Sequence, residues 1–238
     1  MKQLIIDTCN KALSVALVDD VTLVASQNMN GFKNHAETLF PVIDSLVSQA
    51  KWQPTDLEQI IVAYGPGSYT GVRIGVTSAK TLGYTLKIPV KCISSLELLA
   101  YNLCIEEDSY VVSLINARRN HVYASIYQVQ EKRLQTIQAD TYQEITDLQK
   151  QMEQLDGKFY LVGDYQDFIW TGFDYYGADH YQCLPQAYYG LYCQGPIYTG
   201  ADIHQIEPNY LKQVEAIEKW EEQQTTIQKQ DYIKTTKS

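Results

Sequence analysis

The chain has 238 residues, of which 45% are hydrophobic, and this is enough to bury the core of one large domain or two small ones. Its net charge of −9 and isoelectric point near 4.9 exclude a basic surface that could bind a nucleic-acid backbone without a partner. Five cysteines without a Cys-x-x-Cys pair exclude a zinc ribbon and favour a reduced protein over a disulfide framework.

The first half of the chain predicts a set of strands followed by alternating helices and strands. Short β-branched runs joined by tight turns indicate a strand meander, and apolar residues repeating every three to four positions indicate helices. The capping box at Ser94–Glu97 indicates the start of a further helix. In chain order we expect strands at 4–6, 13–18 and 21–26, a helix at 35–50, a strand at 59–63, a helix at 70–86, a strand at 90–93 and a helix from 94 to 103.

The second half repeats this order more weakly after an acidic linker at 106–109. We expect strands at 110–115 and 121–130, a helix at 141–155 and a strand at 159–162, whereas 171–200 shows no clear period. This order predicts an α/β protein with a two-lobed, actin-like (ribonuclease-H-like, ASKHA) fold and mixed sheets flanked by helices. The expected lobes are 1–105 and 106–216, followed by a polar tail at 217–238 that is helical or disordered.

The run from Ala63 to Lys80 places a strand, a glycine-rich turn and a helix start next to one another. Ser68 or Thr70 can cap that helix, because a hydroxyl oxygen accepts hydrogen bonds from the amides of a first turn. Free amides and the helix dipole favour an anion, so a phosphate or nucleotide site is one interpretation. A tight strand-to-helix corner without a ligand is the other, and the spacing fits neither a Walker A loop nor a dinucleotide fingerprint. The anion-binding candidates are Gly65, Gly67, Ser68, Thr70 and Gly71.

A nearly bare row follows on the same helix, where Gly71, Gly75, Ala79 and Gly83 recur every four residues. Glycine in a helix interior costs about 1 kcal/mol relative to alanine, so the row needs a compensating role. Small residues let another element approach closely, and that element is either a helix of a partner or the chain's own sheet.

Several motifs occur in the order seen in one family of proteins, and together they cover the chain up to about residue 216. They are Leu4–Thr8, Ser14–Leu17, His35–Glu37, Leu39–Pro41, Gly65–Lys80, Ser94–Glu97, Asn116–Asn120 and Pro208–Leu211. The sequence thereby resembles the TsaB (YeaZ-like) family, whose members are paralogues of TsaD and of glycoprotease-like proteins. Tyr69, Ala36 and Asn116 stand where the family usually has phenylalanine, serine and aspartate.

The resemblance implies a non-catalytic scaffold or activator subunit for making threonylcarbamoyladenosine in tRNA. Such a subunit pairs with TsaD, and the ATPase TsaE is the third member. The reaction transfers threonylcarbamoyl to the adenosine next to the anticodon of tRNAs that read codons beginning with A. The resemblance also implies that tRNA is bound only by the complex and that the chain alone forms a homodimer. It implies no cofactor held by this chain alone, and places ATP or ADP at the joint interface.

The resemblance further implies that the helices predicted at 35–50 and 70–86 meet their equivalents in TsaD as a helical bundle. Val42 lies off the main apolar stripe of the first helix and widens its apolar face beyond what one sheet needs. The interface candidates are Ala36, Leu39, Val42, Ile43, Leu46, Gly71, Arg73, Gly75, Ala79 and Gly83.

The residues at the candidate catalytic positions favour a non-catalytic subunit over an enzyme. TsaD carries a His-x-x-x-His metal pair after the corresponding strand, and Ser95 and Leu99 occupy those positions here. The chain has four histidines and no pair at ligand spacing, so we expect neither a metal site nor a catalytic residue. Cys9 is expected to be a buried small residue, and His35 is expected to pack at the start of a helix.

Other interpretations stay open at this point. Arg118 and Arg119 lie in a turn, where one contacts an anion or a partner carboxylate, or both are simply solvated. The alternative function is a stand-alone enzyme, either an actin-like ATPase or a glycoprotease-type peptidase, and a third is a protein whose partner lies outside this pathway. A cytoplasmic location away from membranes is expected, since the sequence shows neither a signal peptide nor an apolar segment long enough to span a bilayer.

Overall fold

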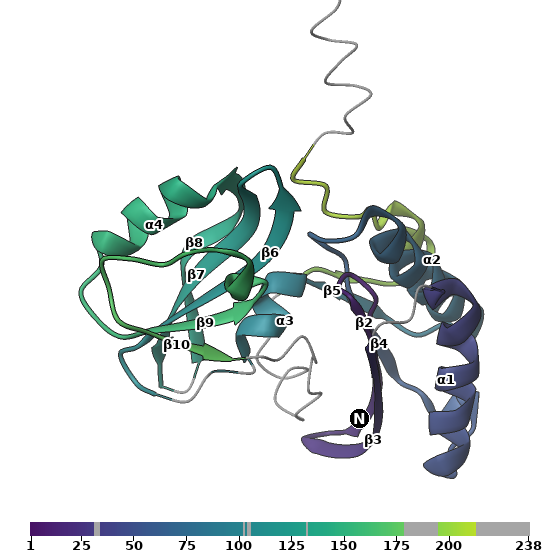
Figure 1. The fold of residues 1–238 in the computed structure, drawn as a ribbon. Helices are drawn as coiled ribbons and strands as arrows, with labels where there is room; N and C mark the ends of the chain where they lie inside the picture. The colour runs from purple at the N-terminus through teal and green to yellow at the C-terminus, as the bar shows by residue number, and fades with distance from the viewer. Residues whose placement is uncertain (31–33, 102, 104–105, 132, 179–194, 213–238) are drawn as a thin grey trace, which may run out of the picture.

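The protein folds into two lobes, each built on one mixed β-sheet with helices against its faces (Figure 1). The computed structural model describes residues 1–30, 34–101, 103, 106–131, 133–178 and 195–212. The predicted tail at 217–238 and most of the region without a clear period lie outside these residues. No helix in the described ranges is both long and apolar enough to cross a membrane.

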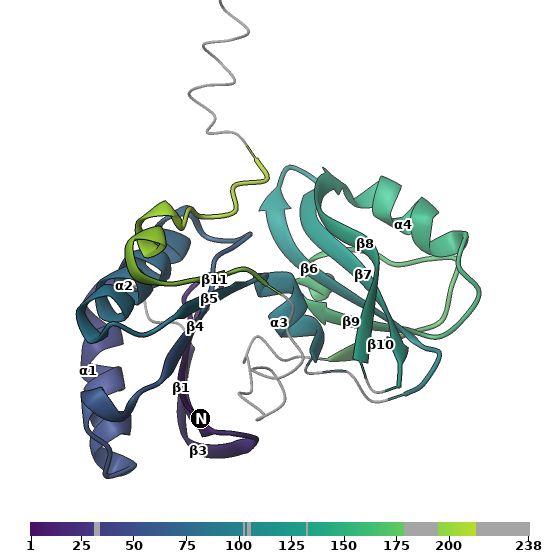
Figure 2. The same cartoon turned by 180° about the vertical axis from the view of Figure 1, so that it is seen from behind.

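The first lobe holds a six-stranded sheet. Its elements are β1 (Lys2–Asp7), β2 (Ala12–Asp19), β3 (Thr22–Asn30), α1 (His35–Gln49), the 3-10 helix η1 (Pro54–Asp56), β4 (Gln59–Ala63), α2 (Tyr69–Leu86), β5 (Val90–Ile93), α3 (Ser95–Tyr101), β11 (Ile197–Tyr198) and η3 (Gly200–Gln205). The strand order is β11-β5-β4-β1-β2-β3, with β1 to β3 antiparallel and with β4 and β5 parallel to β1. Helices α1 and α2 lie side by side on the outer face, whereas α3 lies between the two sheets (Figures 1 and 2).

The second lobe repeats this plan. Its elements are β6 (Tyr110–Arg118), β7 (His121–Gln130), β8 (Arg133–Glu144), α4 (Ile145–Glu153), β9 (Phe159–Gly163), η2 (Tyr165–Asp167) and β10 (Tyr175–Ala178). The order β10-β9-β6-β7-β8 matches β5-β4-β1-β2-β3 strand for strand, and α4 covers the outer face (Figure 1). The duplicated arrangement confirms the predicted two-lobed α/β fold with mixed sheets of the ribonuclease-H-like type.

Local sequence accounts for most of the first core. All five residues of β4 are buried, as its uninterrupted apolar run predicts. Helix α1 packs on β2 and β3 through the apolar stripe that its sequence predicts. The buried residues of this stripe are Leu39, Val42, Ile43, Leu46 and Val47. Ser94 caps α3 as expected, because its Oγ accepts hydrogen bonds from the amides of Leu96 and Glu97.

The structure corrects two predictions for the second half. Residues 141–144 belong to β8 and not to a helix, because they pair with β7 in the register Tyr142↔Tyr123, and α4 begins only at Ile145. The second lobe also does not extend to residue 216. Strand β11 pairs with β5, so the chain has returned to the first lobe by Ile197.

Candidate functional site

The glycine-rich turn is pressed against the turn that joins β1 and β2. Ser68 is the N-cap of α2, and its Oγ accepts from the amide of Gly71 at 3.3 Å. The Ser68 amide itself donates to the carbonyl of Cys9 at 2.8 Å. A Cβ on Gly71 would lie 2.0 Å from the carbonyl oxygen of Thr8, and one on Gly67 would lie 2.4 Å from that of Cys9. These contacts explain both glycines without a ligand.

The other three anion-binding candidates, Gly65, Ser68 and Thr70, have different neighbours. Gly65 adopts a φ of +112° and lies against the backbone of Asn209, whose carbonyl oxygen would be 2.9 Å from an added Cβ. The hydroxyl of Ser68 is used as the helix cap. Thr70 lines a groove beside α1. Anion binding at this turn stays a prediction.

The row of small residues on α2 packs on the chain's own sheet. A Cβ on Gly75 would lie 2.4 Å from Thr8 Oγ1, and one on Gly83 would lie 2.3 Å from Val90 Cγ2. Ala79 is 0% exposed. Close packing on the sheet is thus a sufficient compensating role for Gly71, Gly75, Ala79 and Gly83, and contact of this row with a partner stays a prediction.

The apolar interface candidates on α1 are also part of this core. Leu39, Val42, Ile43 and Leu46 are at most 7% exposed and pack with the sheet. The face is wide because α1 contacts β2, β3 and α2 together, which explains why Val42 lies off a single stripe. These four side chains therefore serve the core of the first lobe, and their contact with a partner stays a prediction. Of the ten interface candidates predicted from the sequence, Ala36 and Arg73 are exposed.

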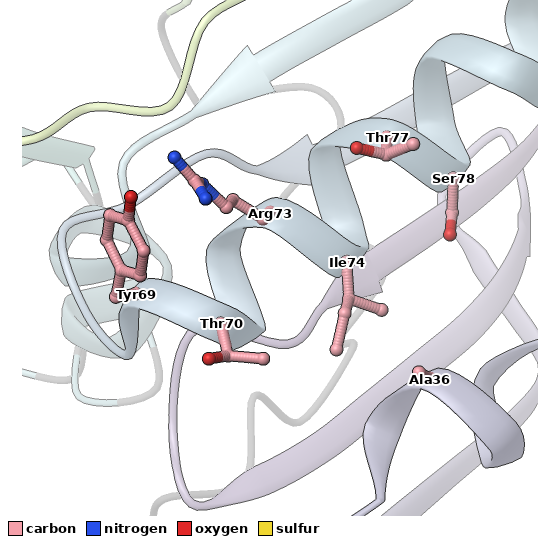
Figure 3. Close-up of a pocket in the computed structure, with 7 residues that line it drawn as sticks. All are labelled: Ala36, Tyr69, Thr70, Arg73, Ile74, Thr77 and Ser78. Carbon is pink, nitrogen blue, oxygen red and sulfur yellow. The ribbon is translucent and has the colours of Figure 1, made fainter.

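A groove of about 430 Å³ separates the start of α1 from the first half of α2 (Figure 3). Figure 3 shows Ile74 pointing toward Ala36 across the groove, while Tyr69 and Arg73 project from the other side of α2. The residues that line it are Ala36, Tyr69, Thr70, Arg73, Ile74, Thr77 and Ser78. The lining thus includes both exposed interface candidates, with Ala36 facing Ile74 and Arg73 at the rim on the other side of α2.

The segment after β11 runs along α2, and sequence periodicity gave no sign of this. Lys80 Nζ donates to the carbonyls of His204 and Ile206, both at 2.9 Å. Further along, Arg73 Nε donates to Tyr210 Oη at 2.8 Å. The signal available beforehand was the Pro208–Leu211 motif, which belongs to the family pattern but has no period of its own.

Two carboxylates join the lobes. Asp164 follows β9 and is 5% exposed, and it accepts from Lys11 Nζ at 2.8 Å and from the amide of Asn116 at 2.9 Å. Asp140 on β8 accepts from the hydroxyls of Ser94 and Ser125, each at 2.7 Å, and from Asn209 Nδ2 at 3.3 Å. The first lobe, the second lobe and the C-terminal segment therefore meet at Asp140.

Asp140 makes stability depend on pH. Burial raises the pKa of its carboxyl above the usual range, although hydrogen bonds from Ser125 and Ser94 act in the opposite direction. Folding thus favours the protonated form, and this contribution is lost as the pH rises from about 4 through the folded-state pKa. We expect Asp140→Asn to be at least as stable as the wild type at pH 7. Its advantage, measured by urea unfolding, should shrink toward pH 4.

The exposed aspartate of α1 supplies the control, because Asp44→Asn changes charge by the same amount without touching the lobe junction. A large loss of stability in Asp140→Asn at pH 7 would show that the three hydrogen bonds outweigh the cost of burying the charge.

Four other residues that the sequence offered as candidates do not line the groove. Cys9 is buried, its Sγ donates to the carbonyl of Ala63, and burial together with the Asp7 carboxylate raises the pKa of its thiol well above the usual range. His35 is the first residue of α1, and its Nε2 lies 3.4 Å from the carbonyl oxygen of Asn10. Arg118 and Arg119 are exposed residues at the β6–β7 turn, outside the groove.

The two positions at which the resemblance implied a metal pair in TsaD belong to the core of this chain. Ser95 and Leu99 are both 0% exposed, and the Ser95 hydroxyl donates to the carbonyl of Pro66. Across the described ranges, no three His, Cys, Asp or Glu side chains gather in a way that could hold a metal ion.

Comparison with known proteins relates the chain to one family. The family model for TsaD, tRNA N6-adenosine threonylcarbamoyltransferase, matches residues 24–176. The TsaB protein of Bacillus subtilis, a tRNA threonylcarbamoyladenosine biosynthesis protein, is 36% identical over 233 residues, covering 94% of this chain and 100% of the relative. TsaB of Escherichia coli is 30% identical over 167 residues, covering 68% and 71% of the two chains.

A solved structure supports the fold. YeaZ from Pseudomonas aeruginosa superposes with a TM-score of 0.68 at 23% identity, covering 88% of this chain and 99% of that one. At this identity the likeness establishes the two-lobed architecture.

Proposed function

Because the chain belongs to the TsaB family of tRNA threonylcarbamoyladenosine biosynthesis proteins, we propose that it is a non-catalytic subunit that acts through a TsaD-type transferase. In this proposal the partner carries out threonylcarbamoyl transfer to the adenosine next to the anticodon, in tRNAs that read codons beginning with A. A TsaE-type ATPase completes the assembly. This chain contributes a surface and not a reacting group.

The observation that supports this proposal is the setting of Ser95 and Leu99, which stand where the resemblance to TsaD implies a pair of metal ligands. The TsaD family model matches across this region, and both side chains are wholly buried. A serine hydroxyl committed to a backbone carbonyl and an aliphatic side chain cannot bind a transition metal. The fold is thus retained while these two side chains serve core packing.

The surface that we assign to the partner is the outer side of α1 and α2 around the groove. Helix α1 exposes Phe40 at 45% of its surface, and α2 exposes Tyr69 at 44%, next to Ala36 and Arg73. Exposed aromatic and arginine side chains are typical of protein interfaces. In the absence of the partner, we propose that the same face joins two copies of the chain. ATP or ADP, where it takes part, would lie at the joint interface.

Reconstitution tests this function. We expect tRNA, a threonylcarbamoyl donor and ATP to give modified tRNA when this chain is mixed with the TsaD-type and TsaE-type proteins from the same organism. Leaving out this chain should reduce the product to background, and the chain alone should give none. Modification by the chain alone would contradict the proposal and favour the stand-alone enzyme, as would partner-independent turnover of ATP or a peptide.

A further inference from the structure

Arg73 carries a positive charge that no carboxylate in the described part of the chain neutralises. Its polar partners are tyrosines: Nε donates to Tyr210 Oη at 2.8 Å, and the guanidinium carbon lies 4.1 Å from the centre of the Tyr69 ring. The Tyr210 ring centre lies 5.9 Å away. An exposed arginine without an acidic partner is unexpected in a protein whose net charge is −9.

The two tyrosines also hold the guanidinium in place. Tyr69 and Tyr210 contact each other with ring centres 5.3 Å apart, and Arg73 lies against both. The hydrogen bond to Tyr210 uses Nε, and Arg73 also has a side-chain hydrogen bond with Tyr69. Because a guanidinium carries more N–H groups than these two tyrosine oxygens use, others remain for a further acceptor. A guanidinium already fixed in this way loses little freedom when it binds, which favours a specific contact.

The groove beside Arg73 suits a single carboxylate. Among its lining residues Arg73 is the one cation, and Ala36, Ile74, Thr70, Thr77 and Ser78 supply apolar and neutral surface. One guanidinium matches one carboxylate through a bidentate pair. A nucleotide polyphosphate carries more negative charge than one guanidinium can neutralise, and the lining holds no other cation.

We propose that Arg73, held between Tyr69 and Tyr210, is the receptor for an aspartate or glutamate side chain of the TsaD-type partner. This proposal rests on the proposed function and names the contact that gives the interface its charge specificity. Arginine and tyrosine are among the residue types that dominate binding energy at protein interfaces. Here Arg73 and the two tyrosines form one cluster at the N-terminal end of α2.

The test compares Arg73→Met with the wild type in binding to the TsaD-type protein, measured by calorimetry at low and high salt. Methionine keeps much of the apolar stem and removes the charge. We expect Kd to rise about 10-fold or more at low salt, with a smaller ratio at high salt because ions screen the pair. The control is Arg133→Met, which removes an exposed arginine from β8 in the second lobe and should leave Kd within about twofold.

A second variant separates charge recognition from support of the C-terminal segment. Tyr210→Phe removes the oxygen that accepts from Arg73 Nε but keeps both the ring and the charge of Arg73, so we expect a clearly smaller rise in Kd than for Arg73→Met. Equal losses in Tyr210→Phe and Arg73→Met would overturn the inference, because Arg73 would then act only by holding the segment. A normal Kd for Arg73→Met would overturn it as well.

The partner carboxylate is identified by a double-mutant cycle over the exposed aspartates and glutamates of the TsaD-type protein. Removing the true partner residue should weaken binding of the wild type but not of Arg73→Met. Independent effects at every position would contradict the inference. A wild-type chain that does not bind the TsaD-type protein at all would instead contradict the proposed function, so the two failures are distinguishable.

Discussion

Gly71→Ala is expected to destabilise the protein by about 2–3 kcal/mol and to lower its Tm by about 4–12 °C. The added Cβ would lie 2.0 Å from the carbonyl oxygen of Thr8, which is backbone and cannot rotate away. The same contact region includes the hydrogen bond from Thr8 Oγ1 to the Gly71 carbonyl at 2.7 Å. Helix α2 must therefore move off β1, or the β1–β2 turn must shift.

Intrinsic helix propensity predicts the opposite sign, since alanine favours a helix over glycine by about 1 kcal/mol. The matched control is Thr77→Ala, an exposed position on the same helix, where the gain in propensity should leave the protein as stable as the wild type or slightly more so. Thermal unfolding followed by circular dichroism measures both variants. A Gly71→Ala protein as stable as the wild type would mean that α2 does not approach Thr8 so closely.

Asp164→Ala is the second variant with a large expected effect, a loss of about 2–3 kcal/mol in urea unfolding at pH 7. The carboxylate is buried at the junction of the lobes, where it accepts from Lys11 Nζ and from the amide of Asn116. Alanine leaves that amide without its acceptor and removes the ionic contact between the β1–β2 turn and the second lobe.

Lys11→Met separates the two contributions. The side chain of Lys11 is 69% exposed, so its ion pair is screened by solvent and should contribute less than about 1 kcal/mol. If Lys11→Met cost as much as Asp164→Ala, the ion pair and not the bond to Asn116 would be the main stabilising contact. An Asp164→Ala protein with unchanged stability would contradict both assignments.

The sequence predicted the elements whose signals are local. The apolar run of β4, the cap at Ser68 and the helix after it were all found from neighbouring residues, and the structure confirms them. Strand β8 was missed because it is an edge strand in which no residue is fully buried, so no alternation of apolar and polar residues marks it. Its pairing with β7 outweighs the helical pattern at residues 141–144.

The site was harder to predict because spacing shows which residues share a helix face but not what that face meets. The row from Gly71 to Gly83 was compatible with a partner or with the chain's own sheet, and only the three-dimensional contacts show that it packs on the sheet. The setting of Arg73 depends on Tyr210, which is 137 positions away in the sequence. A contact of this range leaves no periodic signal in the sequence.

The return of the C-terminal segment to the first lobe also determines when that lobe can be completed. Strand β11 forms the edge of the first sheet beside β5, and Ile203 and Ile206, exposed at 1% and 2%, belong to the first hydrophobic core. During synthesis on the ribosome, residues 1–101 therefore emerge without their last strand and without two of their core side chains. Contacts between such distant parts of a chain form slowly. The first lobe is therefore complete only after the second lobe and residues 197–206 have been synthesised.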